Sequence, residues 1–407
     1  MALDSTPLSY TNGPVATIII AILFVAGFNA YTLVTAPNSR ARVGGVLVLA
    51  GLTGAFQASL RGWCANKGYV SLLVTTAWTI CWHAVEMLLV SKVSAADIEE
   101  LARKHYSKSG ASPTKRWQLF VCTSSLLCKW RRIGTKWQIP NPPRFSPDGS
   151  VPSRAKFLVR SMLKIAGSYL MMSMFSVAPP PDPNLIAIEN QQFFSRLGDI
   201  SSEEAIFRVV STAVFFINVA LMVTMWYYLI CVSSVVLGLA NPEDCPPFYG
   251  SLWNAYTLRG LWRNIHQGLR KCVSGPADAF TDSILRLPRG TFASRCTRLI
   301  LAFGISALIH AQADVANDIP FSEAGQFTFF SIQALAIIVE SAVQEICTRT
   351  GVAALLPQSL QRGLGFLWVI SWFCWITPTW SFMMMRSMDP VKDGIVMPAH
   401  YLAKWFQ

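Results

Sequence analysis

The sequence predicts an all-α polytopic membrane protein, and three observations support this fold class. Hydrophobic residues make up 52% of the 407-residue chain and charged residues only 14%, whereas soluble domains carry about 25% charged residues. Apolar segments long enough to cross a bilayer as helices recur along the chain. The net charge of +12 is concentrated in a few loops between these segments, as the positive-inside rule describes. The basic charge therefore indicates membrane topology rather than nucleic-acid binding.

We expect about eight transmembrane helices in a single domain that spans residues 1–407. The glycine-rich segment 44–60 is the shortest of them. The expected spans are 14–36, 44–60, 70–91, 157–178, 206–238, 299–316, 326–346 and 363–386.

Basic residues assign the loops to the two sides of the membrane. Two regions, 92–156 and 241–298, carry most of the loop Lys and Arg, while loops 179–204 and 317–325 are nearly free of them. The positive-inside rule therefore places both basic regions in the cytosol and both termini on the far side. The ten cysteines form no C-x-x-C pair and no His/Cys spacing suited to zinc, so no metal site is predicted.

A polar island, ISALIHAQAD, interrupts the apolar segment 299–316. A histidine inside a membrane span is costly and is usually kept for function. His310 and Asp314 are four residues apart, so on a helix the carboxylate can reach the imidazole. Such a pair fits a general base oriented by an acid. The alternative is a buried structural histidine bonded to backbone or to a neighbouring helix.

A second polar segment, LRGLWRNIHQGLR, lies in the region 241–298. Helical spacing would place Arg259, Arg263, His266 and Arg270 on one face and Trp262 on an adjacent apolar side. Three arginines on one face suit a phosphate-bearing ligand. A lipid-anchoring amphipathic helix at the cytosolic interface explains the same pattern.

These segments resemble motifs of a known enzyme family. LRGLWRNIHQGLR is similar to S-L-R-x-F-W-G-R-x-W-H-Q-x-x-R, a signature of the wax-synthase branch of the membrane-bound O-acyltransferases. FGISALIHAQAD resembles the partner motif F-x-x-S-G-x-x-H-x-x-x-D, and RRIGTKWQIPN resembles a segment of the fungal members. Leu261, Ala307 and Ile265 depart from these patterns, whereas both histidines match. The resemblance implies that His310 is catalytic and that His266 occupies the upstream Asn-or-His position.

Acyl transfer from a thioester to an alcohol needs a base for the hydroxyl and a hydrogen-bond donor for the developing oxyanion. His310, held by Asp314, is the candidate base, and His266 or Asn264 could polarise the thioester carbonyl. We expect acyl-CoA to contact Arg259, Trp262, Arg263, Arg270 and Lys271. Candidate substrate-pocket residues are Ser306, Glu86 and Glu340.

The position of His310 predicts an internal tunnel. At 1.5 Å per residue, His310 lies about 18 Å along a helix from Arg298, so a cytosolic thioester must reach it between helices. His83 and Glu86, three residues apart in another span, are expected to form a structural pair.

We therefore predict an acyl-CoA-dependent O-acyltransferase that acts on an apolar alcohol in the bilayer, with no metal and no nucleic-acid partner. The fungal resemblance implies a terpenoid alcohol, an acetyl group and the endoplasmic reticulum membrane. Two alternatives remain open. A membrane-embedded terpene cyclase or isomerase would use His310 and Asp314 as an acid–base pair, and a proton-coupled transporter would relay protons through His310, Glu86 and Glu340.

Overall fold

The computed structural model describes residues 12–106, 115–176, 178–191, 196, 198–265, 268–389 and 392–394. Within these ranges every regular element is a helix, which confirms the all-α prediction.

Seven helical segments of the described chain are long and apolar enough to cross a membrane. Two of them are composite: α3 continues through the π-helical turn η1, and α13 is followed directly by α14. The seven segments comprise α1 (Gly13–Val34), α2 (Ala41–Arg61), α3 (Lys67–Val85) with η1 (Glu86–Val90), α7 (Ser202–Val236), α10 (Phe292–Ala316), α11 (Gly325–Arg349), and α13 (Gln358–Ile376) with α14 (Pro378–Ser387).

The expected span 157–178 differs from the other seven. It forms α6 (Arg154–Phe175), which is long enough to cross a bilayer but is not among the seven apolar segments. Four cations in its first half, Arg154, Lys156, Arg160 and Lys164, make this helix less apolar. The polytopic helical bundle is thus confirmed, with seven rather than eight apolar spans in the described chain.

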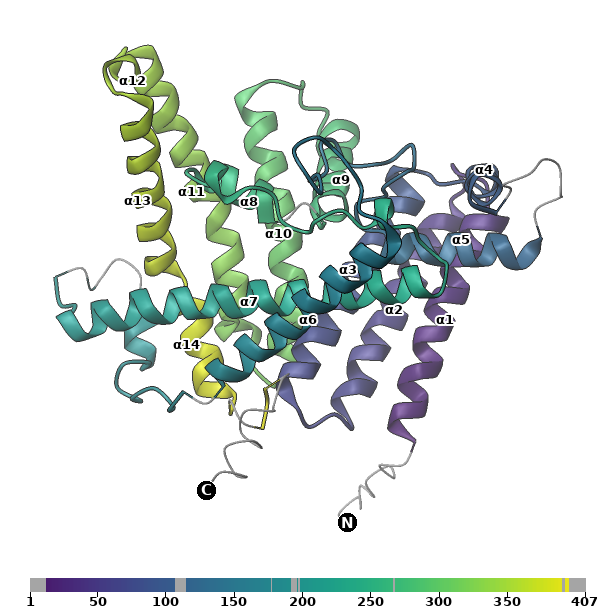
Figure 1. Cartoon of the computed structure of the whole chain (residues 1–407), viewed down its shortest axis with the longest axis horizontal. Helices are drawn as coiled ribbons and strands as arrows, with labels where there is room; N and C mark the ends of the chain where they lie inside the picture. The colour runs from purple at the N-terminus through teal and green to yellow at the C-terminus, as the bar shows by residue number, and fades with distance from the viewer. Residues whose placement is uncertain are drawn as a thin grey trace.

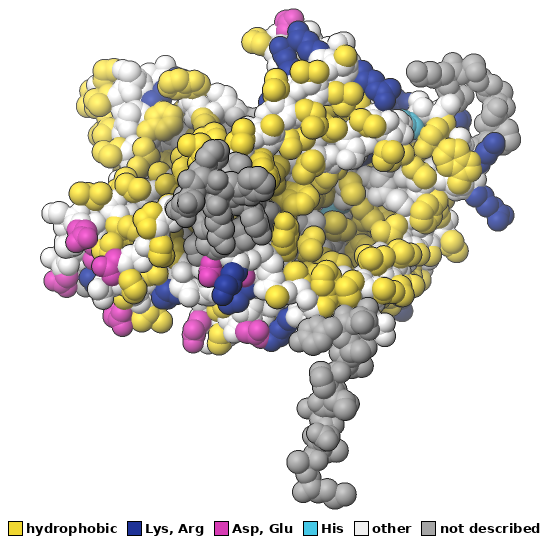
Figure 2. All heavy atoms as spheres, turned by 60° about the horizontal axis from the view of Figure 1, so that its bottom comes forward, with side chains coloured by type: hydrophobic (Ala, Val, Ile, Leu, Met, Phe, Trp, Pro, Cys, Tyr) yellow, Lys and Arg dark blue, Asp and Glu magenta, His cyan; other side chains and the backbone are white. Residues whose placement is uncertain are grey.

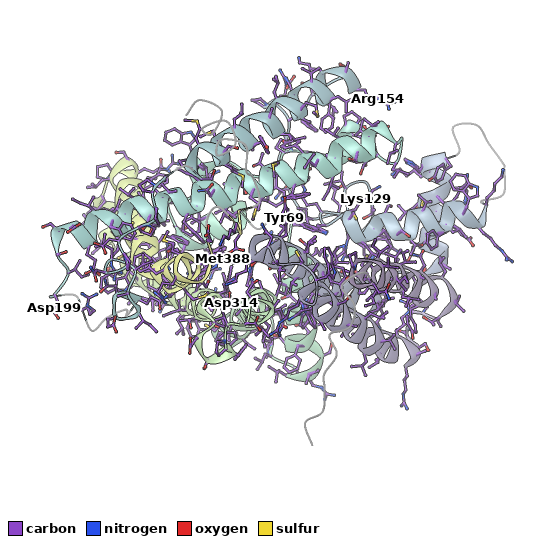
Figure 3. The ribbon with its side chains drawn as sticks, turned by 90° about the horizontal axis from the view of Figure 1, so that it is seen from below. Tyr69, Lys129, Arg154, Asp199, Asp314 and Met388 are labelled. Carbon is purple, nitrogen blue, oxygen red and sulfur yellow. The ribbon has the colours of Figure 1, made fainter. Side chains whose placement is uncertain are left out.

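The helices form a main bundle and a crossing layer. In Figure 1, α1, α2, α3, α10, α11 and α13 run roughly up and down the molecule, while α6 and α7 lie across their front. Figure 3, which looks from below, shows α6 and α7 side by side along one edge of the end-on bundle. The remaining helices are short: α4 (Ala95–Tyr106), α5 (Arg116–Cys128), α8 (Leu258–Ile265), α9 (Arg270–Ala279) and α12 (Val352–Leu355).

The two ends of the bundle differ in what they carry. Helices α4, α8, α9 and α12 lie toward the top of Figure 1, whereas α1 begins and α14 ends at the bottom. Regions 92–156 and 241–298 therefore contribute helices to the same end, as the charge pattern predicts.

Much of the outer surface is apolar. Hydrophobic side chains cover most of the face in Figure 2, and charged groups gather at its upper and lower edges. On α1, Val15, Ile18 and Ile22 are 56–60% exposed. Soluble monomers rarely expose continuous apolar patches of this extent, so these side chains fit contact with lipid.

Two groups are the largest of the four clusters of buried side chains in the described part of the chain. One lies between α1, α2, α3 and α5 and includes Phe28, Leu49 and Leu88. The other lies between α8, α10, α11, α13 and α14, and aromatic rings dominate it. His310, Gln333 and Glu340, which are considered next, contact members of the second group.

Candidate active site

Helix α10 positions the central histidine. It runs unbroken from Phe292 to Ala316 and begins where the Thr291 hydroxyl accepts a hydrogen bond from the Ser294 amide (3.2 Å), which is a typical N-cap. Ser306, His310 and Asp314 follow one another at intervals of four residues and therefore share a face. The structure thus confirms the helical spacing on which the predicted pair depends.

The His310 ring lies against aromatic side chains of two other helices. It stacks on Phe330 of α11, with ring centroids 4.1 Å apart and an interplanar angle of 10°. Trp380 of α14 lies at 5.8 Å and is tilted by 59°. Phe330 also contacts Trp262 of α8 at 5.8 Å. Phe330 therefore links His310 to the second polar segment.

Asp314 joins α10 to the first turn of α11. Its Oδ1 accepts a hydrogen bond from the Gln326 side chain (2.6 Å), and its Oδ2 accepts one from the Gln326 amide (3.3 Å). The carboxylate is buried, at 2% exposure. Asp314 thus fixes the end of α10 that carries His310, and its predicted role in orienting the imidazole stays a prediction.

A line of buried polar residues runs along α11. Gln326, Gln333 and Glu340 are seven residues apart and are at most 7% exposed, so they lie on one side of the helix, two turns from one another. We call these three residues the polar stripe. Each of them is hydrogen-bonded to a residue of another helix.

Gln333, in the middle of the polar stripe, receives two indole donors. Its Oε1 accepts hydrogen bonds from Trp262 (3.2 Å) and from Trp372 of α13 (3.0 Å). Trp262 is buried in the core at 9% exposure. Its polar atom thus donates a hydrogen bond to α11, and its expected role in binding acyl-CoA stays a prediction.

Glu340 caps α8. Its carboxylate accepts hydrogen bonds from the amides of Leu258 (2.6 Å) and Arg259 (3.4 Å), and from the indole of Trp368 (3.0 Å). An acidic group is stabilised at a helix N-terminus by the unpaired amides and the helix dipole. These contacts give Glu340 a structural role beside the substrate-pocket role predicted for it.

The predicted single helix through Arg259, Arg263, His266 and Arg270 is wrong. The structure divides this segment into α8, which ends at Ile265, and α9, which begins at Arg270. Close packing accompanies the break, since a Cβ on Gly268 would lie 3.1 Å from the Phe248 ring. His266 lies outside the described residues. Arg259 and Arg263 remain together on α8, while Arg270 belongs to a different helix.

The other candidates of this segment fall into two groups. Asn264 is buried, donates a hydrogen bond to the Ser251 carbonyl (3.0 Å) and accepts one from the Gly250 amide (3.3 Å). It therefore fixes the loop before α8. Arg259, Arg263 and Arg270 are exposed and Lys271 is half-buried, positions that are open to an anionic ligand.

Glu86 forms an ion pair with an arginine of the RRIGTKWQIPN segment. The partner is Arg132, and both side chains are buried. Arg132 also lies 3.5 Å from Nδ1 of His83, and Ser91 donates a hydrogen bond to Glu86 (2.7 Å). The expected pair of His83 and Glu86 is thus connected through Arg132. Glu86 holds this loop against α3, whereas its predicted pocket role has gained no supporting contact.

The neighbouring Arg131 connects the same loop to the start of the second polar segment. Its guanidinium donates hydrogen bonds to the carbonyls of Pro246 (2.6 Å) and Pro247 (2.5 Å) and to the Tyr227 hydroxyl. Adjacent arginines of one motif therefore fasten the loop on two sides, to α3 and to the chain that leads into α8.

Charged residues also tie α9 to α10. Arg298 of α10 pairs with Asp278 (2.8 Å) and with Asp282, which also pairs with Arg289 (2.7 Å). The hydrogen bonds from Arg289 and Arg298 hold the pKa of the Asp282 carboxyl below its usual range. The helices of the two polar segments are therefore joined directly at this end of the bundle.

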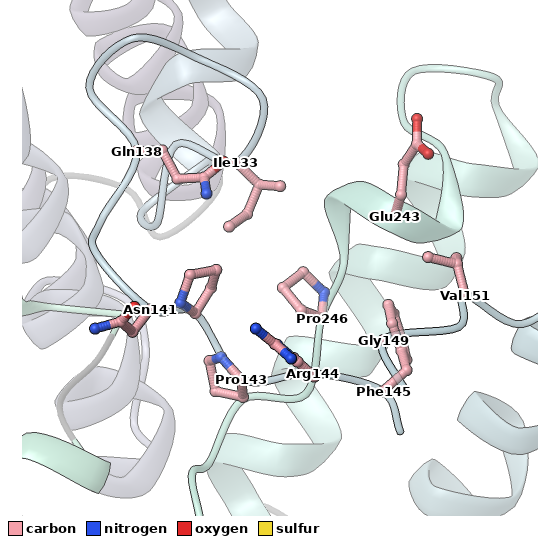
Figure 4. Close-up of a pocket in the computed structure, with 11 residues that line it drawn as sticks. Ile133, Gln138, Asn141, Pro143, Arg144, Phe145, Gly149, Val151, Glu243 and Pro246 are labelled. Carbon is pink, nitrogen blue, oxygen red and sulfur yellow. The ribbon is translucent and has the colours of Figure 1, made fainter. Parts of the chain in front are cut away.

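A cavity of about 430 Å³ opens beside the RRIGTKWQIPN segment. Figure 4 shows Gln138 and Asn141 on one side of it, Glu243 and Val151 on the other, and Arg144 and Pro246 between them. Its size suits a small ligand. Its walls come from loops and include none of the predicted site residues, so the tunnel to His310 stays a prediction.

Two residues of this core were not identified in the sequence: Phe330, which stacks on His310, and Gln333, one turn further along α11. Gln333 carries a sequence signal, because polar residues at intervals of seven inside an apolar span indicate one buried helix face. Phe330 carries no such signal, because the chain contains many aromatic residues and only the packing brings this one to His310.

The fold and this site define an integral membrane protein that encloses a histidine among aromatic rings and buried hydrogen-bonding side chains. Residues 245–332, which include both polar segments, match the Membrane bound O-acyl transferase family. Fungal relatives extend the similarity over most of the chain. Acetyltransferase aurG of Calcarisporium arbuscula is 28% identical over 309 residues, which cover 74% of this chain and 73% of the relative.

Two further relatives give the same result. Acetyltransferase ataH of Aspergillus terreus is 28% identical over 69% of this chain and 94% of its own length. Acetyltransferase pyr8 of Aspergillus fumigatus is 30% identical over 68% of this chain and 66% of its own. The chain belongs to the membrane-bound O-acyltransferase family and is an acyltransferase. The family resemblance carried by the sequence motifs is thereby confirmed.

Proposed function

We propose that this protein transfers an acetyl group from acetyl-CoA to the hydroxyl of an apolar, terpenoid-like alcohol, with His310 as the general base. The observation that carries the proposal is an imidazole enclosed by Phe330 and Trp380 on the helix that holds the family motif. The relatives named as acetyltransferases support the acetyl group. The endoplasmic reticulum is the membrane in which we expect the reaction.

The reaction needs little from the protein beyond positioning and proton transfer. The alcohol oxygen attacks the thioester carbonyl carbon while His310 takes the hydroxyl proton, and the C=O electron pair moves onto oxygen. Collapse of the tetrahedral intermediate re-forms the carbonyl and expels the thiolate of coenzyme A. The imidazolium returns the proton to that thiolate, so the products are the ester and free coenzyme A.

The surroundings of His310 support this role. Stacking on Phe330 restrains the imidazole, and Asp314 and Gln326 fix the helix end that carries it. Aromatic walls suit an apolar alcohol and exclude water, which would otherwise compete as an acyl acceptor. Arg259 and Arg263 supply exposed positive charge for the phosphates of coenzyme A.

The test is His310→Ala, with His105→Ala on α4 as a matched histidine control. We expect His310→Ala to lower the release of free coenzyme A by about 10²–10⁴-fold, the usual contribution of a general base, while the protein stays folded in detergent. The control should retain its rate. Near-normal turnover by a well-folded His310→Ala protein refutes the assignment.

A second measurement separates acyl transfer from the cyclase and transporter alternatives. Arg263→Ala should raise the KM for acetyl-CoA about tenfold to a hundredfold, the effect of one lost charged hydrogen bond, with little change in the KM for the alcohol. Arg349, an exposed arginine paired with Glu345, provides the control substitution Arg349→Ala. Conversion of a polyene without any thioester would favour the cyclase, and solute movement without chemical change would favour the transporter.

A further inference from the structure

The last membrane span is interrupted beside the candidate active site, between α13 and α14. Helix α13 ends at Ile376 and α14 begins at Pro378, where proline cannot donate the amide hydrogen bond that a continuous helix needs. Gly325 of α11 accommodates this turn closely, because a Cβ there would lie 2.0 Å from the Thr379 carbonyl oxygen. The first turn of α14, which carries Trp380, is therefore held directly against α11.

Aromatic rings surround the Trp380 indole. Its ring centroid lies 4.8 Å from that of Phe215, 5.1 Å from Phe329, 5.5 Å from Phe330 and 5.8 Å from His310. The side chain is 9% exposed. The indole therefore lies between His310 and Phe215 of α7, largely shielded from solvent.

The indole N–H of Trp380 is buried and has no hydrogen-bond partner among the described residues. An indole N–H can only donate. Three tryptophans of α8 and α13 donate theirs within the protein, since Trp262 and Trp372 donate to Gln333 and Trp368 donates to Glu340. Burying an unpaired donor is unfavourable, and an acceptor oxygen of a bound substrate would remove this penalty.

A second buried side chain of this core, Gln333, also has an unpaired donor. The Nε2 of Gln333 has no partner among the described residues. The two indole donors on its Oε1 fix the orientation of this amide, so the unpaired atom is the nitrogen. Gln333 follows Phe330 by one helical turn. The aromatic core around His310 thus contains two buried donors without an acceptor among the described residues, Trp380 Nε1 and Gln333 Nε2, which call for an oxygen acceptor.

We propose that Trp380 donates its indole N–H to the carbonyl oxygen of the transferred acyl group and stabilises the oxyanion that forms when the alcohol attacks. The inference rests on the proposed function, because it requires a thioester beside His310. A thioester carbonyl offers only acceptor lone pairs, which matches the two donors. Charge develops on that oxygen in the transition state, where a fixed donor has its largest effect on rate.

The decisive experiment compares two unreactive analogues of acetyl-CoA by calorimetry on the full-length protein in detergent. In the first, a methylene group replaces the sulfur, so the carbonyl is retained but cannot be transferred. In the second, S-ethyl-CoA, the carbonyl oxygen is absent. Trp380→Phe should bind the carbonyl analogue about fivefold to tenfold more weakly than wild type, the effect of one neutral hydrogen bond, and should bind S-ethyl-CoA equally well.

Turnover gives a second readout. Trp380→Phe should lower kcat by about 10²–10³-fold, as removal of an oxyanion donor does elsewhere, with a smaller change in KM. Trp368→Phe is the control, because its indole donates to Glu340 and its loss should lower stability rather than kcat. If Trp380→Phe does not fold, a benzothienyl-alanine at position 380 keeps the shape of the indole and lacks only the N–H.

The outcomes separate this inference from the proposed function. If Trp380→Phe binds each analogue as tightly as the wild-type protein does and has a normal kcat, the proposed role of Trp380 is overturned, while acetyl-CoA remains the acyl donor. If the wild-type protein binds neither analogue, the acetyl-CoA assignment fails and this inference fails with it.

Discussion

Replacing Glu340 with alanine tests whether the polar stripe of α11 holds the helices around His310. The carboxylate accepts two short hydrogen bonds, from the Leu258 amide (2.6 Å) and the Trp368 indole (3.0 Å), and a longer one from Arg259 (3.4 Å). Because Glu340 is only 7% exposed, water cannot replace these contacts without opening the core. The substitution therefore leaves the N-terminus of α8 without its cap and an indole without its acceptor.

The expected loss follows from these contacts. Hydrogen bonds to a charged group contribute about 1.5–3 kcal/mol each, so two short bonds predict that Glu340→Ala lowers the free energy of unfolding by about 3–6 kcal/mol. Glu340→Gln keeps one acceptor oxygen and should lose about half as much. Helix α8 holds Trp262 against Phe330, the ring on which His310 stacks. We therefore also expect a displaced α8 to lower the rate of acyl transfer.

The assay is thermal unfolding in detergent, followed by tryptophan fluorescence, together with release of free coenzyme A. Glu345→Ala serves as the control, since Glu345 lies on the same helix but is 60% exposed and forms an exposed ion pair with Arg349, a contact worth at most about 0.5 kcal/mol. Equal unfolding temperatures for Glu340→Ala and Glu345→Ala would refute the reasoning.

Two further substitutions test contacts on either side of the site. Arg132→Ala leaves Glu86 as a buried charge without its ion-pair partner and should lower the free energy of unfolding by about 3–5 kcal/mol. Lys136→Ala is the control, because it removes an exposed ion pair from the same loop and should lower the free energy of unfolding by less than about 1 kcal/mol. Similar losses for the two variants in denaturant titrations would contradict this prediction. Gly365→Ala places a Cβ 2.2 Å from a carbonyl oxygen of the chain that leads into α8, so we expect lower thermal stability and slower acyl transfer. The control is Gly363→Ala, whose Cβ meets no atom within 4 Å, so this variant should be neutral or slightly stabilising. Indistinguishable melting curves for the Gly365 and Gly363 variants would show that the close approach at Gly365 is absent.

Hydropathy and spacing predicted most of the fold. A long apolar segment must satisfy its backbone internally in a bilayer, so it forms a helix whatever its neighbours are. The segment 157–178 was the exception, because four cations near its start are compatible with a long helix but not with a fully apolar span. Nothing in local sequence indicates that α6 and α7 cross the other helices, since that angle depends on packing.

The candidate site was predictable where it depended on one helix. His310 and Asp314 share α10, so their spacing alone placed them on one face. The segment from Arg259 to Arg270 was predicted as one helix because its charges fit a 3.6-residue period, and the pattern could not reveal the close contact at Gly268 that accompanies the break. Contacts between distant segments, such as Glu340 with Leu258, could not be derived from periodicity.

The polar stripe also constrains how the protein is assembled in the membrane. Gln326 and Gln333 bind Asp314 and Trp262, which precede α11 in the chain, but Gln333 and Glu340 also need indoles of α13, which is synthesised later. When α11 first enters the bilayer, part of its hydrogen-bonding capacity is therefore unfilled, and an unsatisfied polar group in hydrocarbon is costly. Helix α11 reaches its final position only once α13 has been inserted beside it. The His310 site is consequently completed last, by the C-terminal spans, and a chain truncated before residue 358 would lack the α13 partners of Gln333 and Glu340 and the wall that carries Trp380.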